Sequence, residues 1–264
     1  MYPFKYHKAA TVRGAVSLLK KAEEPKLLAG GQTLIPTMKQ RLASPKAIID
    51  LAGAGLSGIE QKGRTIVIGA MTTHAEVASS AAVQATIPAL ARLAGNIGDP
   101  QVRHKGTIGG SVANNDPAAD YPAALIALGA TVHTNKRKLP AEEFFAGLFS
   151  TVLDEDEIIT KIAFPAPGKA AYVKFPNPAS RYAIVGVFVA KKGRSVRVAV
   201  TGAGNNGVFR HAAMEEALSK RFNAKSLEGI ATEAKDLNGD IHASADYRAH
   251  LVGVMARRAV AAAA

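Results

Sequence analysis

The pattern of hydrophobic and polar residues predicts an α+β chain that begins with a βαβ-like unit. An amphipathic helix precedes a short apolar segment, and a second helix then leads to a buried strand. These elements are expected at residues 11–22, 26–29, 33–41 and 47–51. The pattern then changes to antiparallel sheet, because residues 59–69 have the character of a hairpin with its turn at Lys62–Gly63.

The rest of the chain divides near a cluster of proline and glycine. Before it we expect helices at residues 73–79, 87–94 and 120–128, a long loop at 99–115, and strands at 130–134 and 158–164. Pro165, Pro167 and Gly168 then indicate a boundary. Beyond it the pattern predicts three strands followed by helices, at residues 171–175, 182–191, 195–201, 210–219, 226–235 and 246–260.

Composition limits the chemistry that this chain of 264 residues can carry by itself. It has no cysteine, which excludes disulfides, a thiolate nucleophile and any cysteine-ligated zinc or iron–sulfur cluster on this chain. The formal net charge is +12, but the basic residues are spread along the chain and accompany no nucleic-acid-binding motif. Residues 1–10 lack the apolar core of a signal peptide and no apolar stretch is long enough to span a membrane, so we expect a cytoplasmic protein.

The glycine-rich segments are the candidate ligand-binding sites. Gly53–Gly58 matches a dinucleotide-binding fingerprint but precedes a hairpin, and Gly202–Gly207 lacks the following strand with a ribose-binding acid, so both are interpreted as connections. Residues 29–34 and 107–111 each contain adjacent glycines whose N–H groups can form an anion-binding nest. Two such nests suit a diphosphate approached from two sides. Two unrelated glycine turns are the alternative.

Two longer segments carry a resemblance to a known family. They are AGGQTLIPTMKQR at residues 29–41 and IGDPQVRHKGTIGGSVANNDPAADYPAAL at residues 97–125. Together they resemble the FAD-binding medium subunit of molybdenum hydroxylases, the carbon monoxide dehydrogenase and xanthine dehydrogenase group. Residues 142–165, 181–190 and 240–259 are similar to later segments of that subunit, in the same order. His104 departs from the pattern, since a small polar residue is expected there.

The resemblance implies a fold and a cofactor. The fold is the two-lobed FAD-binding fold shared with vanillyl-alcohol oxidase and p-cresol methylhydroxylase. A C-terminal α/β domain of three antiparallel strands followed by helices would close over the flavin. FAD would be held non-covalently. The corresponding divisions are residues 1–57 for the first lobe, 58–167 for the second and 168–264 for the closing domain.

The resemblance also assigns the two glycine loops to the FAD pyrophosphate. Main-chain N–H groups of the first loop would surround it, and the second loop would approach it from the other lobe. The residues are Ala29, Gly30, Gly31, Gln32, Thr33 and Leu34 in the first loop, and Thr107, Ile108, Gly109, Gly110 and Ser111 in the second.

Five further positions correspond to residues around the cofactor. Asp120 would bond hydroxyls of the FAD sugar or ribityl chain, Lys174 would lie near the flavin, and Tyr182 would reach the isoalloxazine ring. Ile97 and Ile159 would pack around the cofactor. From the residues alone, these two isoleucines can equally be core residues. Asp120 can be a helix N-cap and Lys174 a surface lysine.

The implied function is electron transfer within a complex. The chain would take electrons from [2Fe–2S] clusters of a small partner subunit and pass them to an external acceptor. A large partner subunit would hold molybdopterin, in a dimer of heterotrimers. No side chain of this chain is expected to be catalytic or to bind a metal. The alternatives are a self-sufficient FAD-dependent oxidase or reductase of the same fold, and a basic nucleic-acid-binding or scaffolding protein without a cofactor.

Overall fold

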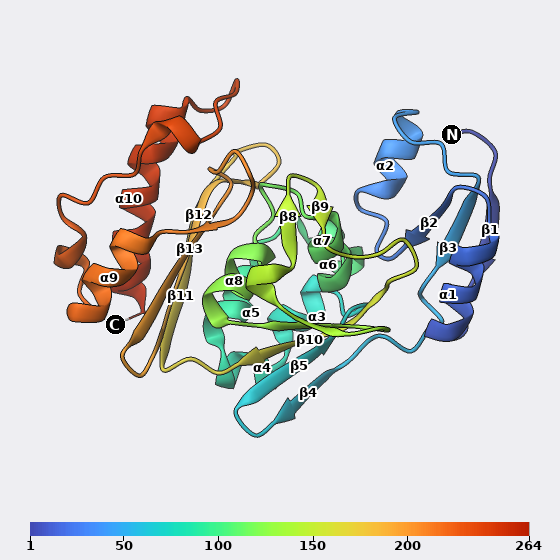
Figure 1. Cartoon of the computed structure of the whole chain (residues 1–264), viewed down its shortest axis with the longest axis horizontal. Helices are drawn as coiled ribbons and strands as arrows, with labels where there is room; N and C mark the ends of the chain where they lie inside the picture. The colour runs from blue at the N-terminus through green and yellow to red at the C-terminus, as the bar shows by residue number, and fades with distance from the viewer. Residues whose placement is uncertain (264) are drawn as a thin grey trace.

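Three sheets of different topology organise the protein, as a computed structural model of residues 1–263 shows (Figure 1). We call the regions around them the N-terminal lobe (residues 5–50), the central lobe (residues 59–165) and the C-terminal lobe (residues 169–263). The three lobes follow one another along the long axis of the molecule. Among residues 1–263, no helix combines the length and the hydrophobicity needed to cross a membrane.

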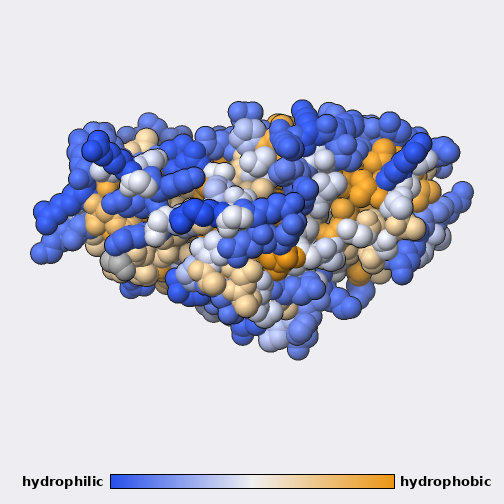
Figure 2. All heavy atoms as spheres, turned by 90° about the horizontal axis from the view of Figure 1, so that it is seen from below, coloured by the Kyte–Doolittle hydropathy of each residue, from blue (hydrophilic) through white to orange (hydrophobic). Residues whose placement is uncertain are grey.

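The N-terminal lobe is a small parallel sheet with the order β1-β3-β2. Its elements are β1 (Lys5–Lys8), α1 (Val12–Lys21), β2 (Pro25–Leu28), α2 (Leu34–Lys39) and β3 (Ala47–Asp50). Helix α1 begins where the Thr11 hydroxyl accepts the Gly14 N–H at 3.0 Å. The predicted βαβ-like pattern is present, and β1 is an addition that the sequence pattern did not indicate. Seen from below, hydrophobic side chains gather over this lobe, at the right of Figure 2.

The central lobe is an antiparallel sheet with the order β4-β5-β10-β6-β7, covered by short helices. Its strands are β4 (Ile59–Lys62), β5 (Thr65–Gly69), β6 (Thr131–Thr134), β7 (Lys138–Pro140) and β10 (Ile159–Pro165), with a separate pair β8 (Phe145–Gly147) and β9 (Ser150–Thr151). The helices are α3 (His74–Ser79), α4 (Ala81–Thr86), α5 (Pro88–Gly95), α6 (Pro100–Lys105), α7 (Ile108–Asn114) and α8 (Tyr121–Leu128).

The prediction of a loop at residues 99–115 is wrong, because two helices, α6 and α7, occupy most of this segment. Each begins at a capping side chain. Asp99 Oδ1 accepts the Val102 N–H at 2.8 Å, and Thr107 Oγ1 accepts the Gly110 N–H at 3.1 Å. The Thr107 cap compensates for the low helix propensity of Gly109 and Gly110 in α7, and α6 between the flanking glycines contains none.

The C-terminal lobe is an antiparallel sheet with the order β11-β12-β13-β14 and helices that follow it. Its elements are β11 (Lys169–Pro176), β12 (Ala183–Lys192), β13 (Ser195–Thr201), β14 (Phe209–Arg210), α9 (Ala212–Lys220) and α10 (Ala245–Ala262). The three long strands followed by helices are as predicted. The helix expected at residues 226–235 is wrong: only short 3₁₀ turns form at Ala224–Leu227 and Ala234–Asp236, and Gly229 between them has φ +77°.

Strand β12 joins the C-terminal lobe to the rest of the molecule, because both of its faces are buried. Val185, Val187 and Val189 pack with residues of α10. Phe188 and Ala190, on the opposite face, belong to the core of the central lobe. Helix α8, buried along its whole length, lies against β12 and β13. Burial on both faces explains the continuous apolar run of this strand.

Arg248 of α10 is a buried cation that ties this helix to the sheet. Its guanidinium Nη1 donates to Ile184 O at 2.6 Å and to Gly202 O at 2.8 Å, and Nη2 donates to Asp240 Oδ2 at 2.7 Å. Gly202 has φ +82°, and a Cβ there would lie 2.4 Å from Ala183 O. The glycine-rich segment 202–207 is therefore a tight connection between β13 and β14.

We expect Arg248→Met to lower the free energy of unfolding by about 2–4 kcal/mol, because two buried carbonyl oxygens lose a charged donor. Urea denaturation of the full chain measures this. Arg258→Met on the exposed side of the same helix is the matched control and should change the midpoint little. Equal midpoints for the two variants would contradict the role given to Arg248.

Candidate functional site

A cavity of about 710 Å³ lies where the three lobes meet. The N-terminal lobe contributes residues 25–27 and 29–34, the central lobe contributes residues of α7 and the start of β10, and residues 180–182 come from the loop before β12. Most of the predicted site residues line this cavity: Ala29, Gly30, Gly31, Gln32, Thr33, Leu34, Ile97, Thr107, Gly109, Gly110, Ser111, Asp120, Ile159 and Tyr182. Ile108 and Lys174 do not line it.

The first glycine loop presents backbone N–H groups that are free to bind a ligand. Within residues 1–263, the N–H groups of residues 30–33 donate to no protein acceptor. Gly31 has φ +72°, which a residue with a side chain rarely adopts. A Cβ on Gly30 would lie 2.0 Å from Lys105 O of the central lobe. The loop therefore needs glycine both for its turn and for its close approach to the neighbouring lobe.

The second glycine loop has a different role from the first. Ile108 N–H donates to Thr72 O at 3.0 Å, Gly109 N–H to Ala70 O at 2.8 Å, and Gly110 N–H to the Thr107 hydroxyl at 3.1 Å. The prediction of a second nest of free N–H groups is therefore wrong. A Cβ on Gly109 would lie 2.6 Å from the Ala70 Cβ, so this glycine lets α7 pack closely against the end of β5. The Ile108 side chain points into the core of the central lobe.

Asp120 is a buried carboxylate that receives two donors from β11. The Tyr172 hydroxyl donates to Oδ1, and the Lys174 ammonium donates to Oδ2 at 3.1 Å and to Asn96 O at 2.8 Å. Burial raises the pKa of Asp120, and Lys174 and Tyr172 oppose that rise. The Asp120 side chain makes no N-cap bond to α8, and the Lys174 side chain is only 8% exposed. Neither of the two simpler interpretations, helix cap and surface lysine, describes these residues.

Tyr172 and Gly186 are parts of this arrangement that the sequence did not reveal. Tyr172 lies two residues before Lys174 and so points to the same face of β11. Gly186 faces Lys174 across the sheet, and a Cβ there would lie 2.3 Å from the Tyr172 hydroxyl. A glycine inside an otherwise apolar strand was the available signal, because it marks a place where another group approaches the backbone.

His74, at the start of α3, is a further lining residue that the sequence did not identify. It is 4% exposed, and its Nδ1 has no hydrogen-bond partner within residues 1–263. Burial, and then the charge of Arg103, lowers its pKa to about 4, so the ring is neutral at neutral pH. The neighbouring Tyr121 ring lies 5.4 Å away between centroids, and its hydroxyl is also without a partner among the described residues.

Tyr182 and Asp116 complete the wall on the side of the C-terminal lobe. Tyr182 is 47% exposed and lies at the cavity. Burial raises its pKa, and the carboxylates of Asp116 and Asp120 add to that rise. Burial also raises the pKa of Asp116. The aromatic ring, partly open to solvent at the cavity, is a surface on which a planar ligand can stack.

The fold and the cavity together define a class of protein. A loop of free N–H groups on one lobe, a buried carboxylate on the next and an aromatic side chain from a third region surround one cavity. This arrangement defines a multi-lobed protein with a binding cavity between its lobes, and the free N–H groups suit an anionic ligand.

Comparison with known proteins identifies the family. The family model "FAD binding domain in molybdopterin dehydrogenase" matches residues 2–167, and "CO dehydrogenase flavoprotein C-terminal domain" matches residues 170–263. The chain therefore belongs to the FAD-binding medium subunits of molybdopterin hydroxylases, the carbon monoxide dehydrogenase and xanthine dehydrogenase family. It is an oxidoreductase subunit with the mixed α+β fold of that family, as the resemblance in the sequence implied.

Individual relatives agree with this assignment over almost the whole chain. The carbon monoxide dehydrogenase medium chain of Hydrogenophaga pseudoflava is 38% identical, covering 98% of this chain and 96% of the relative. The nicotine 6-hydroxylase medium subunit of Paenarthrobacter nicotinovorans is 35% identical, covering 97% and 95%. The structure of reconstituted CO dehydrogenase from Oligotropha carboxidovorans contains a similar chain, with a TM-score of 0.90, 34% identity, and coverage of 100% and 99%.

The depressed pKa of His74 predicts a loss of stability at mildly acidic pH. The unfolded chain binds this proton near pH 6.5 and the folded chain only near pH 4, so stability falls as pH decreases through that interval. Between about pH 7.5 and 5 the contribution is about 2 kcal/mol. We expect His74→Phe to lose less stability over this range than the wild type, measured by urea denaturation.

The matched control is His242→Phe, at an exposed histidine whose removal should leave the pH dependence of the wild type unchanged. Parallel pH profiles for His74→Phe and the wild type would show that His74 is not the responsible group.

Proposed function

We propose that this chain is the FAD-carrying electron-transfer subunit of a heterotrimeric molybdenum hydroxylase. Non-covalently bound FAD would carry electrons from [2Fe–2S] clusters of a small partner subunit to an external acceptor, and a large partner subunit would hold molybdopterin. The observation that carries the proposal is the set of free N–H groups at residues 30–33, on a cavity shared by three lobes.

The residues around the cavity suit the parts of FAD. A volume of about 710 Å³ is within the usual range for cofactor sites. The free N–H groups of the first loop would bind the pyrophosphate, with the second loop opposite. Each carboxylate oxygen of Asp120 can accept a further hydrogen bond, so Asp120 can still hold a hydroxyl of the sugar or ribityl chain. Ile97, Ile159 and Tyr182 would contact the rings.

Lys174 and Asp120 would set the charge near the isoalloxazine ring. The Lys174 ammonium is buried and held by Asp120 and Asn96 O. A fixed positive charge in a site of low dielectric stabilises negative charge on a nearby group. We infer that Lys174 favours the reduced form of the bound flavin. No side chain of this chain then needs to act as a general acid or base.

The division of labour between subunits is part of the same proposal. The chain has no cysteine, so it offers no thiolate to an iron–sulfur cluster. Its relatives carry names such as medium chain and medium subunit, which denote one component of a larger enzyme. We propose a dimer of heterotrimers. We propose residues 1–57, 58–167 and 168–264 as two flavin lobes and a closing domain; residue 264 lies outside the described residues.

Purification of the tagged full chain from its native host tests the assignment. We expect a protein with the absorption spectrum of FAD that co-purifies with two further subunits, one containing molybdenum and one containing iron, as measured by elemental analysis. A yellow chain that elutes alone and whose flavin is bleached by a small substrate would instead indicate the self-sufficient oxidase or reductase. A colourless chain would contradict both.

We expect Gly30→Ala to weaken FAD binding at least about tenfold, since the new Cβ would collide with Lys105 O and force the loop away from the central lobe. Fluorescence titration of the deflavinated protein with FAD measures the dissociation constant. Gly95→Ala is the matched control, because its Cβ would meet only Ala78, at an ordinary contact distance of 3.8 Å. Unchanged FAD affinity in Gly30→Ala would contradict the assigned site.

We expect Lys174→Met to lower the two-electron reduction potential of the bound flavin by about 30 mV or more. The reason is the loss of the buried cation next to Asp120. Spectroelectrochemical titration measures the potential, and Lys169→Met, at an exposed lysine of the same strand, is the control. If Lys174→Met retains too little FAD for this titration, the double variant Lys174→Met/Asp120→Asn is measured instead, because it leaves no unpaired carboxylate. A potential equal to that of the wild type would exclude the proposed role.

A further inference from the structure

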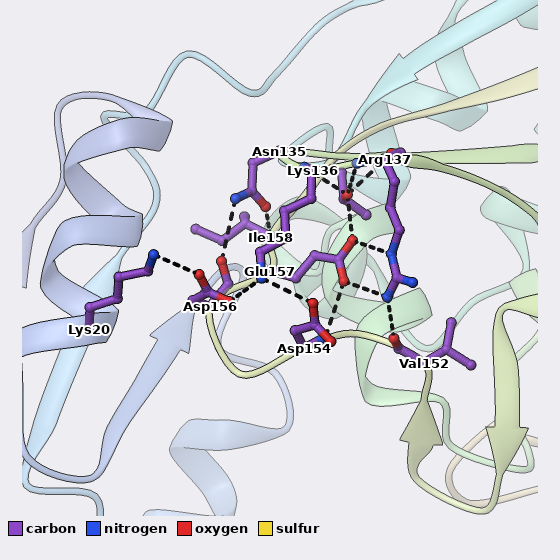
Figure 3. Close-up of polar contacts among 10 residues, drawn as sticks. Lys20, Asn135, Lys136, Arg137, Val152, Asp154, Asp156, Glu157 and Ile158 are labelled. Atoms are coloured by element: carbon purple, nitrogen blue, oxygen red, sulfur yellow. Dashed lines mark hydrogen bonds and ion pairs between the residues drawn. The ribbon is translucent and has the colours of Figure 1, made fainter.

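The turn between β9 and β10 forms one wall of the cavity and is unusually acidic. We call residues 154–157 (Asp-Glu-Asp-Glu) the acidic turn (Figure 3). Glu155, Glu157, Ile158 and Ile159, in or directly after this turn, line the cavity. Polar contacts fix this turn on two sides.

One side of the acidic turn is fixed inside the central lobe. Arg137 holds Glu157 with two parallel hydrogen bonds, from Nε to Oε1 at 2.9 Å and from Nη2 to Oε2 at 2.8 Å. Thr134 adds a hydroxyl donor to Oε1 at 2.7 Å, and the Glu157 side chain is fully buried. The Arg137 hydrogen bonds are the main reason that the pKa of Glu157 falls to about 2. This paired carboxylate keeps the turn in place against its own lobe.

The other side of the acidic turn reaches the N-terminal lobe. Asp156 Oδ2 lies 3.0 Å from the Nζ of Lys20 in α1, while Oδ1 is bonded to Lys136 (Figure 3). The hydrogen bond from Lys136, followed by that from Lys20, lowers the pKa of Asp156 to about 2. Among the described residues, Lys20–Asp156 is the single ion pair that joins residues 1–57 to the remainder of the chain.

An apolar contact accompanies this ion pair. Ile158, two residues after Asp156, is buried in the core of the N-terminal lobe together with Ile49 and Leu51, and Leu19, the neighbour of Lys20, packs against the same core. Asn135 Oδ1 accepts the Ile158 N–H at 2.7 Å, and Asn135 N–H donates to Ile158 O at 3.1 Å. A segment held rigidly by the central lobe thus inserts one side chain into the N-terminal lobe beside the ion pair.

These contacts lie beside the cavity and join two of the lobes that line it. The N-terminal lobe provides the first glycine loop, and the central lobe provides the acidic turn and the opposite wall. Separation of the two lobes would break the Lys20–Asp156 pair and withdraw Ile158 from its core. We propose that Lys20 and Asp156 form a latch that holds the N-terminal lobe closed over bound FAD and slows its dissociation. Lys20 is then a positioning residue, and the inference rests on the proposed FAD site.

The latch is exposed enough to be sensitive to salt. The Lys20 side chain is 60% exposed, so the pair is screened by solvent and ions. Pairs of this kind change an equilibrium or a rate by about twofold to fivefold. The Arg137–Glu157 pair, whose carboxylate is buried, is screened much less. Ionic strength is therefore expected to act on the latch and to leave the acidic turn itself in place.

The test is the rate of FAD dissociation from the full chain after dilution, followed by flavin fluorescence. Lys20→Gln should release FAD about twofold to fivefold faster than the wild type at about 0.01 M salt. At about 1 M salt the two should release FAD at the same rate, because the Debye length has fallen to about 3 Å. Lys21→Gln, at the exposed neighbouring lysine of α1, is the matched control and should follow the wild type.

A double-mutant cycle assigns the effect to the pair. In the Asp156→Asn background, Lys20→Gln should no longer change the dissociation rate. A wild-type rate for Lys20→Gln at low salt, or an acceleration that persists in Asp156→Asn, would overturn the latch. A wild-type chain that binds no FAD would overturn the proposed function and the latch together, so the two failures are distinguishable.

Discussion

The rest of the structure depends on the pairing of the buried carboxylate of Asp120 with Tyr172 and Lys174. A carboxylate removed from water is costly unless it is paired and hydrogen-bonded. Both of its partners, Tyr172 and Lys174, lie on β11 of the C-terminal lobe, while Asp120 directly precedes α8 of the central lobe. The C-terminal sheet must therefore dock in one register before the cavity wall is complete. Burial of β12 on both faces gives that docking its apolar area.

Close backbone approach is the second constraint, and it explains the glycines better than phosphate binding alone does. Gly30 meets Lys105 O, Gly109 meets Ala70, and Gly186 makes room for the Tyr172 hydroxyl. Only the first loop combines such an approach with free N–H groups. One lobe thus supplies the free N–H groups, and the other lobes supply the buried charge and the aromatic wall of the cavity.

The acidic turn is a charged segment that lines the cavity and contacts two lobes. Glu157 fixes the turn to the central lobe, whereas Asp156 and Ile158 connect it to the N-terminal lobe. The carboxylate of the Arg137–Glu157 pair is buried, whereas the more exposed Lys20–Asp156 pair spans the two lobes. Salt therefore screens the contact between the lobes more than the contact that fixes the turn to the central lobe.

Much of this protein is determined by sequence alone, namely the long amphipathic and apolar elements, the α+β class, the first glycine loop and the family. These follow from local periodicity and from the order of motifs. Tertiary structure decided the rest. Capping bonds at Asp99 and Thr107 turned a glycine-rich segment into helices. Acceptors on Ala70 and Thr72 occupied the N–H groups of the second loop. The burial and pairing of Asp120, Lys174, His74 and the acidic turn depend on residues distant in sequence. Which segments meet in space cannot be deduced from local patterns.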